Sequence, residues 1–291
     1  MSIKVEKVSV IYQKKTPFEQ RALNNVSLTI NQGDILGIYG LTGSGKSTLL
    51  QTLNGLIKPD SGNIIVDGVA VNKLKGSQIT ELRHKVGMIF QYPELQIFER
   101  NVFEEIAFGL KNIGLKGEQL KKRVTKALDL VDMSFDEFKD RSPFTLSSGQ
   151  KKRITIASVL ACKPKYLLFD EPTTGLDTTG RTKLLSHINE INNLEGITSV
   201  LVSHKIEELV TVCNKLIIMA NGEIALKGTA LEVIQQAEKN GLVEPITIRN
   251  IANNLKQRGF KLEKNILNIE DLSNEIIKAL NERGNNSDFR Y

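Results

Sequence analysis

The chain has 291 residues, of which 40% are hydrophobic, and its 39 basic and 33 acidic residues give a formal net charge of +6. This length allows one large domain or two, and the mild basic excess permits an acidic ligand or a membrane surface as partner without requiring either. The chain has two cysteines, three scattered histidines, no signal-peptide core and no apolar run near the roughly 20 residues that span a bilayer. We therefore expect a soluble cytosolic protein with reduced thiols and no metal cluster.

The first ninety residues alternate β-branched apolar runs with turn residues and two helical patterns. We expect the first two strands to pair as a hairpin, and the last strand to carry Gln91 to the edge of the sheet. The expected strands are residues 3–12, 22–30, 35–39, 63–67 and 86–90, and the expected helices are residues 46–55 and 77–85.

A glycine-rich loop separates the strand at 35–39 from the following helix. Its sequence is Gly40-Leu41-Thr42-Gly43-Ser44-Gly45-Lys46-Ser47-Thr48. Glycines let backbone N–H groups approach a phosphate, and a helix N-terminus adds partial positive charge. A P-loop of this form places Lys46 on the β- and γ-phosphates and Ser47 on Mg²⁺, and the other loop residues except Leu41 are nucleotide-binding candidates. A loop that only closes a strand onto a helix is the alternative, but the full spacing and both flanks favour phosphate binding.

The middle of the chain is helical, and strands and helices alternate after it. Helices at 102–112, 118–131 and 149–161 predict a helical subdomain of about residues 100–160. Strands at 166–169, 199–202 and 216–219, separated by helices at 178–192 and 206–213, predict a doubly wound α/β core. A hairpin turn at Asn221-Gly222 leads into a last strand at 223–226.

The composition changes after Ala237, where Asn, Lys and Glu become frequent. We therefore predict a main domain at residues 1–238 and a small C-terminal domain at residues 239–291. Helical patterns at 247–258 and 271–280 lie in the second domain, and residues 281–291 are expected to form a frayed tail.

An acidic pair, Asp170-Glu171, follows the apolar strand at 166–169. In a P-loop fold, Asp170 lies where it can bind the Mg²⁺ water shell opposite Ser47, and Glu171 can polarise a water in line with the γ-phosphate. Taken alone, such a pair fits an ordinary solvated turn equally well. The upstream P-loop and the following residues 172–177 favour the catalytic interpretation.

The segment Leu146-Ser147-Ser148-Gly149-Gln150 precedes a helix, so it forms either a simple N-cap or a second anion site. It is followed by Asp170-Glu171, by Gly175-Leu176-Asp177, and by a single histidine, His204, after a strand. The order of these motifs after the P-loop and Gln91 resembles the nucleotide-binding subunit of the ATP-binding cassette (ABC) family over about residues 1–235.

This resemblance implies a P-loop NTPase with a RecA-like parallel-sheet core, an antiparallel β subdomain and an inserted helical subdomain. It implies that two subunits sandwich two ATP molecules head to tail, so that the signature residues Ser147, Ser148, Gly149 and Gln150 act in trans and Asp177 lines the seam. Within one subunit the resemblance implies catalytic roles for four residues: Lys46, Gln91, Glu171 and His204. It implies that Ser47, Gln91 and Asp170 bind the metal ion. It also implies that Tyr12 stacks on adenine. Tyr12 as a packing residue and His204 as a structural residue are the alternatives. The family usually has glycine where this chain has Ser148, which leaves open the effect on hydrolysis at the completed site.

Two stretches, residues 91–98 and 101–109, look like the Q-loop region of energy-coupling factor (ECF) importers, and the Pro-Glu-x-Gln-x-Phe pattern at 93–98 looks most like the second of their two ATPase paralogues. Residues 251–262 are similar to the C-terminal segment through which these ATPases pair. The resemblance implies a second ATPase, in a heterodimer or homodimer, an integral-membrane coupling (T) subunit and a substrate-capture (S) subunit at the cytoplasmic face of the cell membrane. The cargo would be a vitamin or a transition-metal ion, which the capture subunit selects. Residues 95–108 would receive a coupling helix, although core packing explains Phe103, Ile106 and Phe108 equally well.

Two other functions compete with this one. An ATPase of a conventional ABC importer is the nearer alternative. A soluble ABC protein acting on ribosomes or DNA is the other, but the chain has one set of motifs, no heptad array and no basic patch with interleaved aromatics, so we expect no nucleic-acid partner.

Overall fold

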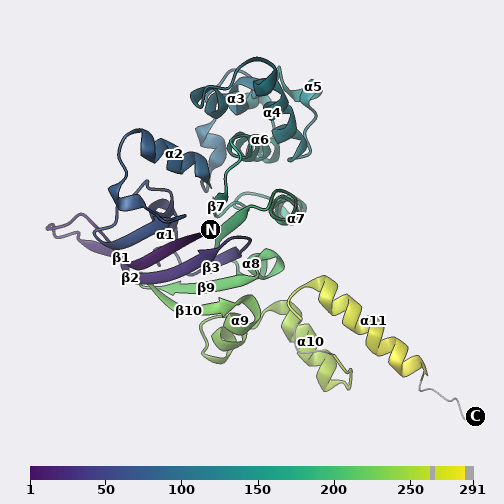
Figure 1. Ribbon diagram of the computed structural model, residues 1–291. Helices are drawn as coiled ribbons and strands as arrows, with labels where there is room; N and C mark the ends of the chain where they lie inside the picture. The colour runs from purple at the N-terminus through teal and green to yellow at the C-terminus, as the bar shows by residue number, and fades with distance from the viewer. Residues whose placement is uncertain (263–265, 286–291) are drawn as a thin grey trace, which may run out of the picture.

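The computed structural model describes residues 1–262 and 266–285. A central body built from two sheets lies between a lobe of helices and a C-terminal pair of helices, as Figure 1 shows. The fold is of the α/β class that the strand and helix pattern predicts.

The larger sheet has six strands in the order β10-β9-β3-β8-β7-β6. All neighbouring pairs from β9 to β6 are parallel, and β10 is antiparallel to β9. Because parallel strands run the same way, the chain leaves β3, β6, β7 and β8 at one edge, where loops after them can form a site. The strands are β3 (Ile35–Tyr39), β6 (Val86–Ile89), β7 (Tyr166–Asp170), β8 (Thr198–Ser203), β9 (Lys215–Ala220) and β10 (Glu223–Thr229).

The smaller sheet is antiparallel, in the order β2-β1-β4-β5. It is formed by β1 (Ser2–Tyr12), β2 (Gln20–Asn31), β4 (Ser61–Val66) and β5 (Val69–Ala70). The expected hairpin of the first two strands is confirmed, with Tyr12 opposite Gln20. The turn at Asn221-Gly222 is confirmed as well: both residues have positive φ, 50° and 77°, which matches the mirror-image turn that suits a twisted hairpin.

Helix α1 (Lys46–Leu53) lies between the two sheets, as its leucines show. Leu49, Leu50 and Leu53 have no exposed surface and pack in one core cluster with Val5 of the small sheet and Ile38 of the large one. Burial of one such leucine contributes roughly 1.5–3 kcal/mol. The packing therefore fixes the start of this helix, and with it the glycine-rich loop, against the sheet edge.

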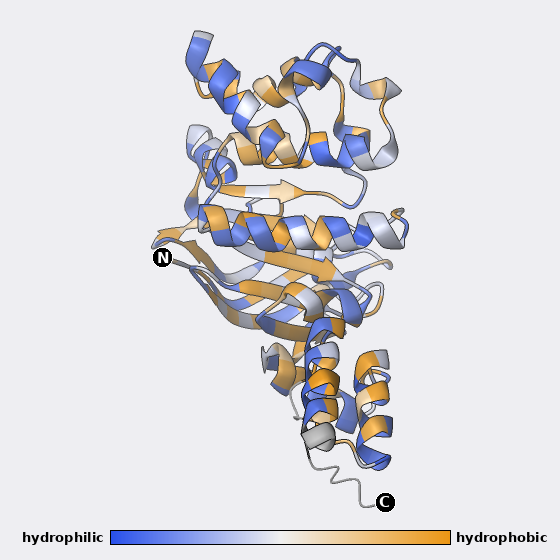
Figure 2. Ribbon diagram, turned by 90° about the vertical axis from the view of Figure 1, so that its right-hand side faces the viewer, coloured by the Kyte–Doolittle hydropathy of each residue, from blue (hydrophilic) through white to orange (hydrophobic). Residues whose placement is uncertain are grey.

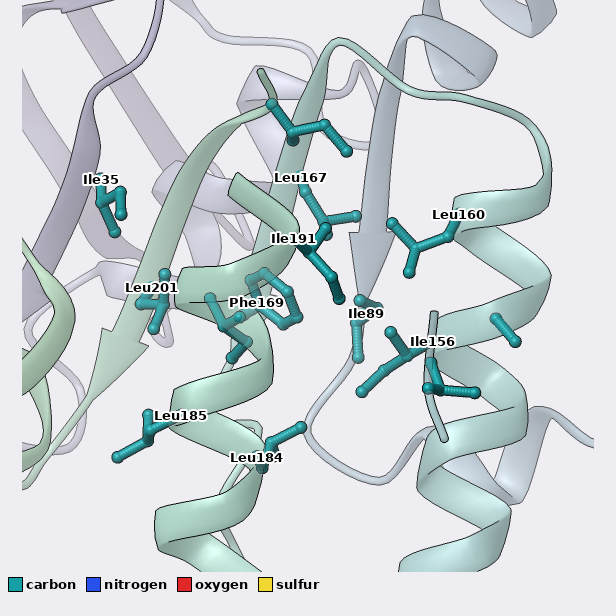
Figure 3. Packing of buried hydrophobic residues seen from close by; sticks show 14 of the residues in the cluster. Ile35, Ile89, Ile156, Leu160, Leu167, Phe169, Leu184, Leu185, Ile191 and Leu201 are labelled. Carbon is teal, nitrogen blue, oxygen red and sulfur yellow. The ribbon is translucent and has the colours of Figure 1, made fainter. Parts of the chain in front are cut away.

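A second core cluster lies on the other face of the large sheet and joins it to the helical lobe. Figure 3 shows Ile89, Leu167 and Phe169 of the sheet facing Ile156 and Leu160 of α6 and Leu184 of α7. The lobe contains α3 (Val102–Asn112), α4 (Gly117–Asp129), α5 (Phe135–Phe138) and α6 (Ser148–Ala161). Helices α7 (Thr178–Glu195), α8 (Ile206–Val212) and α9 (Ala230–Lys239) complete this cluster, and α2 (Ser77–Lys85) precedes β6. The described residues also contain the short 3₁₀ turns η1 (Val71–Lys73), η2 (Pro93–Gln96) and η3 (Pro143–Thr145).

The C-terminal helices α10 (Thr247–Gln257) and α11 (Ile269–Asn285) have a small core of their own, in which Ala252, Ile266 and Leu272 are buried. Figure 2 shows them projecting from the sheet body on the side opposite the helical lobe. The prediction of a frayed tail from residue 281 is wrong for residues 281–285, which continue α11; residues 286–291 lie outside the described part of the chain.

Helix α9 was not predicted from the sequence, although a signal for it exists. Thr229 accepts from the Glu232 N–H while the Glu232 side chain accepts from the Thr229 N–H, which is a capping box. Val233, Ile234 and Ala237 then follow at helical spacing, and all three are buried in the large cluster. The preceding strand pattern of β10 concealed this helix start.

Candidate active site

The glycine-rich loop runs from β3 into α1. Gly45 is the N-cap of α1 with φ of 100°, and a Cβ there would lie 2.4 Å from the carbonyl oxygen of Ala22, so only glycine fits. No side chain of residues 1–262 or 266–285 caps α1, which leaves its first N–H groups available to an anion. The hydroxyl oxygen of Ser44 is buried without a hydrogen-bond partner among the described residues. This combination fits a phosphate group.

Lys46 has 6% of its surface exposed, and its ammonium group donates to the carbonyl oxygens of Gly40 at 2.8 Å and Leu41 at 2.9 Å. Burial lowers the pKa of Lys46, and the nearby carboxylates of Glu171 and Asp170 oppose that change by favouring the charged amine. A buried ammonium that makes hydrogen bonds to carbonyl groups is stabilised further by a multiply charged anion. Lys46 is therefore suited to contact a polyphosphate.

Ser47 and Asp170 come from different elements and meet at the sheet edge. The Ser47 hydroxyl donates to Oδ1 of Asp170 at 3.0 Å. Burial raises the pKa of Asp170; the Ser47 hydrogen bond and Lys46 lower it, and Glu171 raises it. Hydroxyl and carboxylate oxygens are the donor types that Mg²⁺ prefers, so this pair fits a magnesium ion.

Glu171 is the point at which three strand ends converge. Its Oε2 accepts from the Gln91 amide at 3.0 Å and from the Thr174 hydroxyl at 3.3 Å, and it lies 3.1 Å from Nδ1 of His204. Glu171 has φ of 48°, an uncommon conformation for a residue other than glycine, and its N–H donates to the Val202 carbonyl. These contacts hold one carboxylate in place beside the P-loop.

An open cleft of about 390 Å³ contains the P-loop and Glu171. At its β1 end the Tyr12 hydroxyl lies 3.2 Å from the Thr48 hydroxyl, and 39% of Tyr12 is exposed. An exposed ring beside the cleft fits a planar base. The cleft is lined by Tyr12, Gln20, Ala22, Thr42, Gly43, Gly45, Lys46, Ser47, Thr48, Gln91, Glu171 and His204.

The signature segment lies elsewhere in the chain's own fold. Ser147 is the N-cap of α6, and its side chain accepts from the Gln150 N–H while the Gln150 side chain accepts from the Ser147 N–H. Ser147 and Ser148 are exposed, and a Cβ on Gly149 would meet no atom within 4 Å in the described part of the chain. None of residues 147–150 lines the cleft, and α6 lies in the helical lobe, away from α1 (Figure 1).

Asp177 is also outside the cleft. It is the exposed N-cap of α7, and its carboxylate accepts from the Gly180 N–H at 2.7 Å. The structure thus brings the P-loop, Tyr12, Gln91, Asp170, Glu171 and His204 together, and it does not bring the signature residues or Asp177 to them.

Four contributors to this site were missed by the sequence reasoning: Gln20, Ala22, Lys152 and Thr174, whose hydroxyl donates to Glu171. Gln20 and Ala22 line the cleft, and the hairpin that places Gln20 opposite Tyr12 was the signal for them. Lys152 of α6 is 3% exposed, and its amine donates to the carbonyl oxygens of Pro172, at 3.2 Å, and Thr174. Lys152 lies four residues before Ile156, on the same apolar face of the helix. This spacing was the signal in the sequence that the Lys152 side chain is buried.

No helix in residues 1–262 or 266–285 combines the length and the apolar character needed to cross a bilayer. Strand, glycine-rich loop and helix, with Lys46 and Ser47 facing Asp170 and Glu171, define a P-loop nucleoside-triphosphate-binding site.

Comparisons with known proteins identify the kind of P-loop protein. The family model described as ABC transporter matches residues 23–174. The energy-coupling factor transporter ATP-binding protein EcfA2 of Caldanaerobacter subterraneus subsp. tengcongensis is 44% identical over 96% of this chain and 98% of its own. EcfA2 of Clostridium perfringens is 42% identical over 98% of this chain and 100% of its own. The solved structure of cbiO1 from Clostridium perfringens, part of the ABC transporter complex cbiONQ, has a TM-score of 0.73 and 32% identity, and the match covers 87% of this chain and 98% of that one.

The chain therefore belongs to the ABC transporter family, and within it to the ATP-binding subunits of energy-coupling factor transporters. The predictions of the family, of the α/β P-loop fold and of an ATPase that works in transport are confirmed.

Proposed function

We propose that this protein hydrolyses ATP at the cleft between the P-loop and Glu171 and so energises an ECF importer of vitamins or transition-metal ions. The observation that carries the proposal is the convergence of Gln91, Thr174 and His204 on one carboxylate beside Lys46. The near full-length similarity to EcfA2 proteins supports an ECF transporter as the complex in which this ATPase works.

The P-loop, Tyr12, Gln91, Glu171 and His204 have proposed roles in hydrolysis. Lys46 and the loop N–H groups bind the β- and γ-phosphates, and Tyr12 stacks on adenine. Glu171 accepts a proton from the attacking water, which requires a carboxylate held at a fixed position. His204 contacts the γ-phosphate, and Gln91 positions the water beside Glu171.

Mg²⁺ is the proposed metal, held by Ser47, Asp170 and Gln91. When bound, the ion neutralises the charge that develops on the phosphate oxygens. The oxygen-rich donor set and the 3.0 Å contact between Ser47 and Asp170 support this assignment.

The signature residues 147–150 are proposed to complete the ATP site of a partner subunit, with Asp177 at the seam. Two features support action in trans: both serines are exposed, and none of the four residues lines the cleft of its own chain. A solved cassette to which this chain is similar, MJ0796, is dimeric; the structure with ADP and Pi bound matches with 31% identity and a TM-score of 0.71. Closure of the γ-phosphate by a second helix N-terminus would exclude water and stabilise the developing charge.

A membrane partner is proposed to dock on an aromatic surface next to Gln91. We call the residues Tyr92, Leu95, Phe98 and Phe108 the Q-loop patch; their exposed fractions range from 44% at Phe108 to 81% at Leu95. The rings of Phe98 and Phe108 are 4.9 Å apart, edge to face. Ile106 is fully buried and Phe103 packs against the core, so core packing accounts for these two residues and leaves the patch for the coupling (T) subunit.

The C-terminal helices are proposed to pair with those of the second ATPase, in a heterodimer or a homodimer. They form our proposed C-terminal domain, residues 239–291, beside the main domain at 1–238. Ile251, Ile269 and Ile277 are exposed on helices α10 and α11, which supports a contact surface. With a T subunit and a substrate-capture (S) subunit, the complex would place this protein at the cytoplasmic face of the membrane.

Affinity purification from detergent-solubilised membranes tests this assembly. We expect the tagged chain to recover a second ATPase and integral-membrane subunits, without an extracytoplasmic binding protein. A Leu95→Asp/Phe98→Asp variant should lose the membrane subunits and keep the ATPase partner. Recovery of a soluble binding protein would favour a conventional importer, and recovery with ribosomes alone would overturn the transport function.

A further inference from the structure

Glu208 on α8 is a buried carboxylate outside the ATP cleft. It has 6% of its surface exposed, whereas its neighbour Glu207 is exposed. An ionised carboxylate in such a place is destabilising unless charges and hydrogen bonds compensate it. The residues that contact the Glu208 carboxylate therefore indicate its role.

Those partners come from three separate segments. The Thr173 hydroxyl donates to Oε2 of Glu208 at 2.6 Å, and the Ser203 hydroxyl donates to the same oxygen at 3.0 Å. The other oxygen, Oε1, lies 3.1 Å from Nε of Arg181 and 3.7 Å from the Lys205 amine. One carboxylate thus ties the chain after β7, the end of β8 and the start of α7 to helix α8.

Two of these segments continue directly to Glu171. Thr173 precedes Thr174, whose hydroxyl donates to Oε2 of Glu171 at 3.3 Å. Ser203 precedes His204, whose Nδ1 lies 3.1 Å from the same Glu171 oxygen. Glu208 therefore restrains two of the three residues that contact the Glu171 carboxylate, Thr174 and His204, although it does not line the cleft itself.

The backbone of Glu171 makes such restraint necessary. Its φ of 48° is unfavourable for a residue with a side chain, and it persists only where surrounding contacts hold it. The Glu171 N–H donates to Val202 on β8, so the strand end that carries Ser203 also holds the Glu171 backbone. A shift of that strand end would move the Glu171 backbone and His204 together.

We infer that Glu208 is a positioning residue for ATP hydrolysis, which keeps Glu171 and His204 aligned by fixing Thr173 and Ser203. This inference rests on the proposed function, because it requires Glu171 to act on the attacking water. Small displacements of a catalytic group lower the rate steeply while leaving the binding of substrate nearly unchanged.

The test compares Glu208→Gln with Glu207→Gln in the complete transporter complex. Both variants remove one negative charge from adjacent positions of α8, but only Glu208 contacts Thr173 and Ser203. We expect Glu208→Gln to lower kcat for ATP about tenfold or more with KM changed less than about twofold, and Glu207→Gln to leave both unchanged. A normal kcat in Glu208→Gln, or equal losses in the two variants, would overturn the inference.

Two further measurements separate the possible failures. In a Glu171→Gln background, Glu208→Gln should cause no additional loss of turnover, because the residue that it aligns is already disabled. Normal turnover in Glu171→Gln alone would instead show that the proposed function is wrong. If Glu208→Gln folds poorly, Thr173→Val replaces it: removing one hydroxyl should lower kcat in the same direction without changing KM, and an unchanged kcat would overturn the inference.

Discussion

Two loop-to-helix junctions of this chain carry similar polar residues but have opposite surroundings. At the P-loop, Ser44 and Lys46 are buried, and the Ser47 hydroxyl donates a hydrogen bond to Asp170 at the sheet edge. At the signature segment, Ser147 and Gln150 satisfy each other in a capping box. Both present a helix N-terminus, but only the first lies in the cleft that contains Glu171.

The difference shows why one chain holds only part of a catalytic site. The P-loop acquires its partners from β6, β7 and β8, because parallel strands end at one edge. At the signature segment, by contrast, a Cβ on Gly149 would meet no atom of the described residues within 4 Å. A second subunit is the proposed source of its ligand, and the four predictions below test that division.

The largest effect is expected for Glu171→Gln. The substitution keeps the side-chain size but removes the base, so turnover should fall about 10²- to 10⁴-fold. ATP binding should persist, and ATP should stabilise the closed pair of subunits. Steady-state ATPase assays with size-exclusion chromatography measure both effects. Unchanged hydrolysis would show that another group activates the water.

Lys46→Ala should act on binding instead. The change removes a buried ammonium that faces the proposed phosphate site, and charge-assisted hydrogen bonds of this kind contribute about 1.5–3 kcal/mol. We expect ATP affinity to fall roughly ten- to a hundredfold by calorimetry. Glu171→Gln serves as the control that binds ATP normally. An unchanged ATP affinity in Lys46→Ala would show that Lys46 does not contact the phosphates.

Ser147→Ala tests the signature segment. Loss of the cap should lower the free energy of unfolding by about 1 kcal/mol. If the hydroxyl also contacts the partner's nucleotide, turnover of the paired enzyme should fall about tenfold or more, with ATP binding to the isolated chain unchanged. Ser134 precedes α5 without making a cap hydrogen bond, so Ser134→Ala is the matched control. Wild-type turnover in Ser147→Ala would show that Ser147 only caps the helix.

Ser148→Gly should have the smallest effect. Ser148 is exposed at the first position of α6, and no side-chain hydrogen bond ties it to the rest of the described chain. We expect intact ATP binding and a change in turnover of less than about tenfold, which corresponds to roughly 1.4 kcal/mol of barrier. Complete loss of turnover or a very large gain would mean that this side chain controls the completed site.

Much of the fold was predictable because local chemistry and tertiary structure agree. The strand at Ile35–Tyr39 and the helix at Ser77–Lys85 were predicted with the bounds that the structure has. The helix at Ala230–Lys239 was missed because its capping box directly follows a strand, and residues 281–285 were misjudged because polar composition does not distinguish a helix from a tail.

The sequence by itself determined the P-loop, the acidic pair after β7 and the family, because these depend on residue types at fixed spacing along the chain. Only the tertiary structure decided that Gln91, Thr174 and His204 meet at one oxygen of Glu171, and that a buried Glu208 holds two of their segments. The physical reason is that such contacts join residues far apart in the chain, and parallel strand order and core packing, which spacing alone does not encode, bring them together.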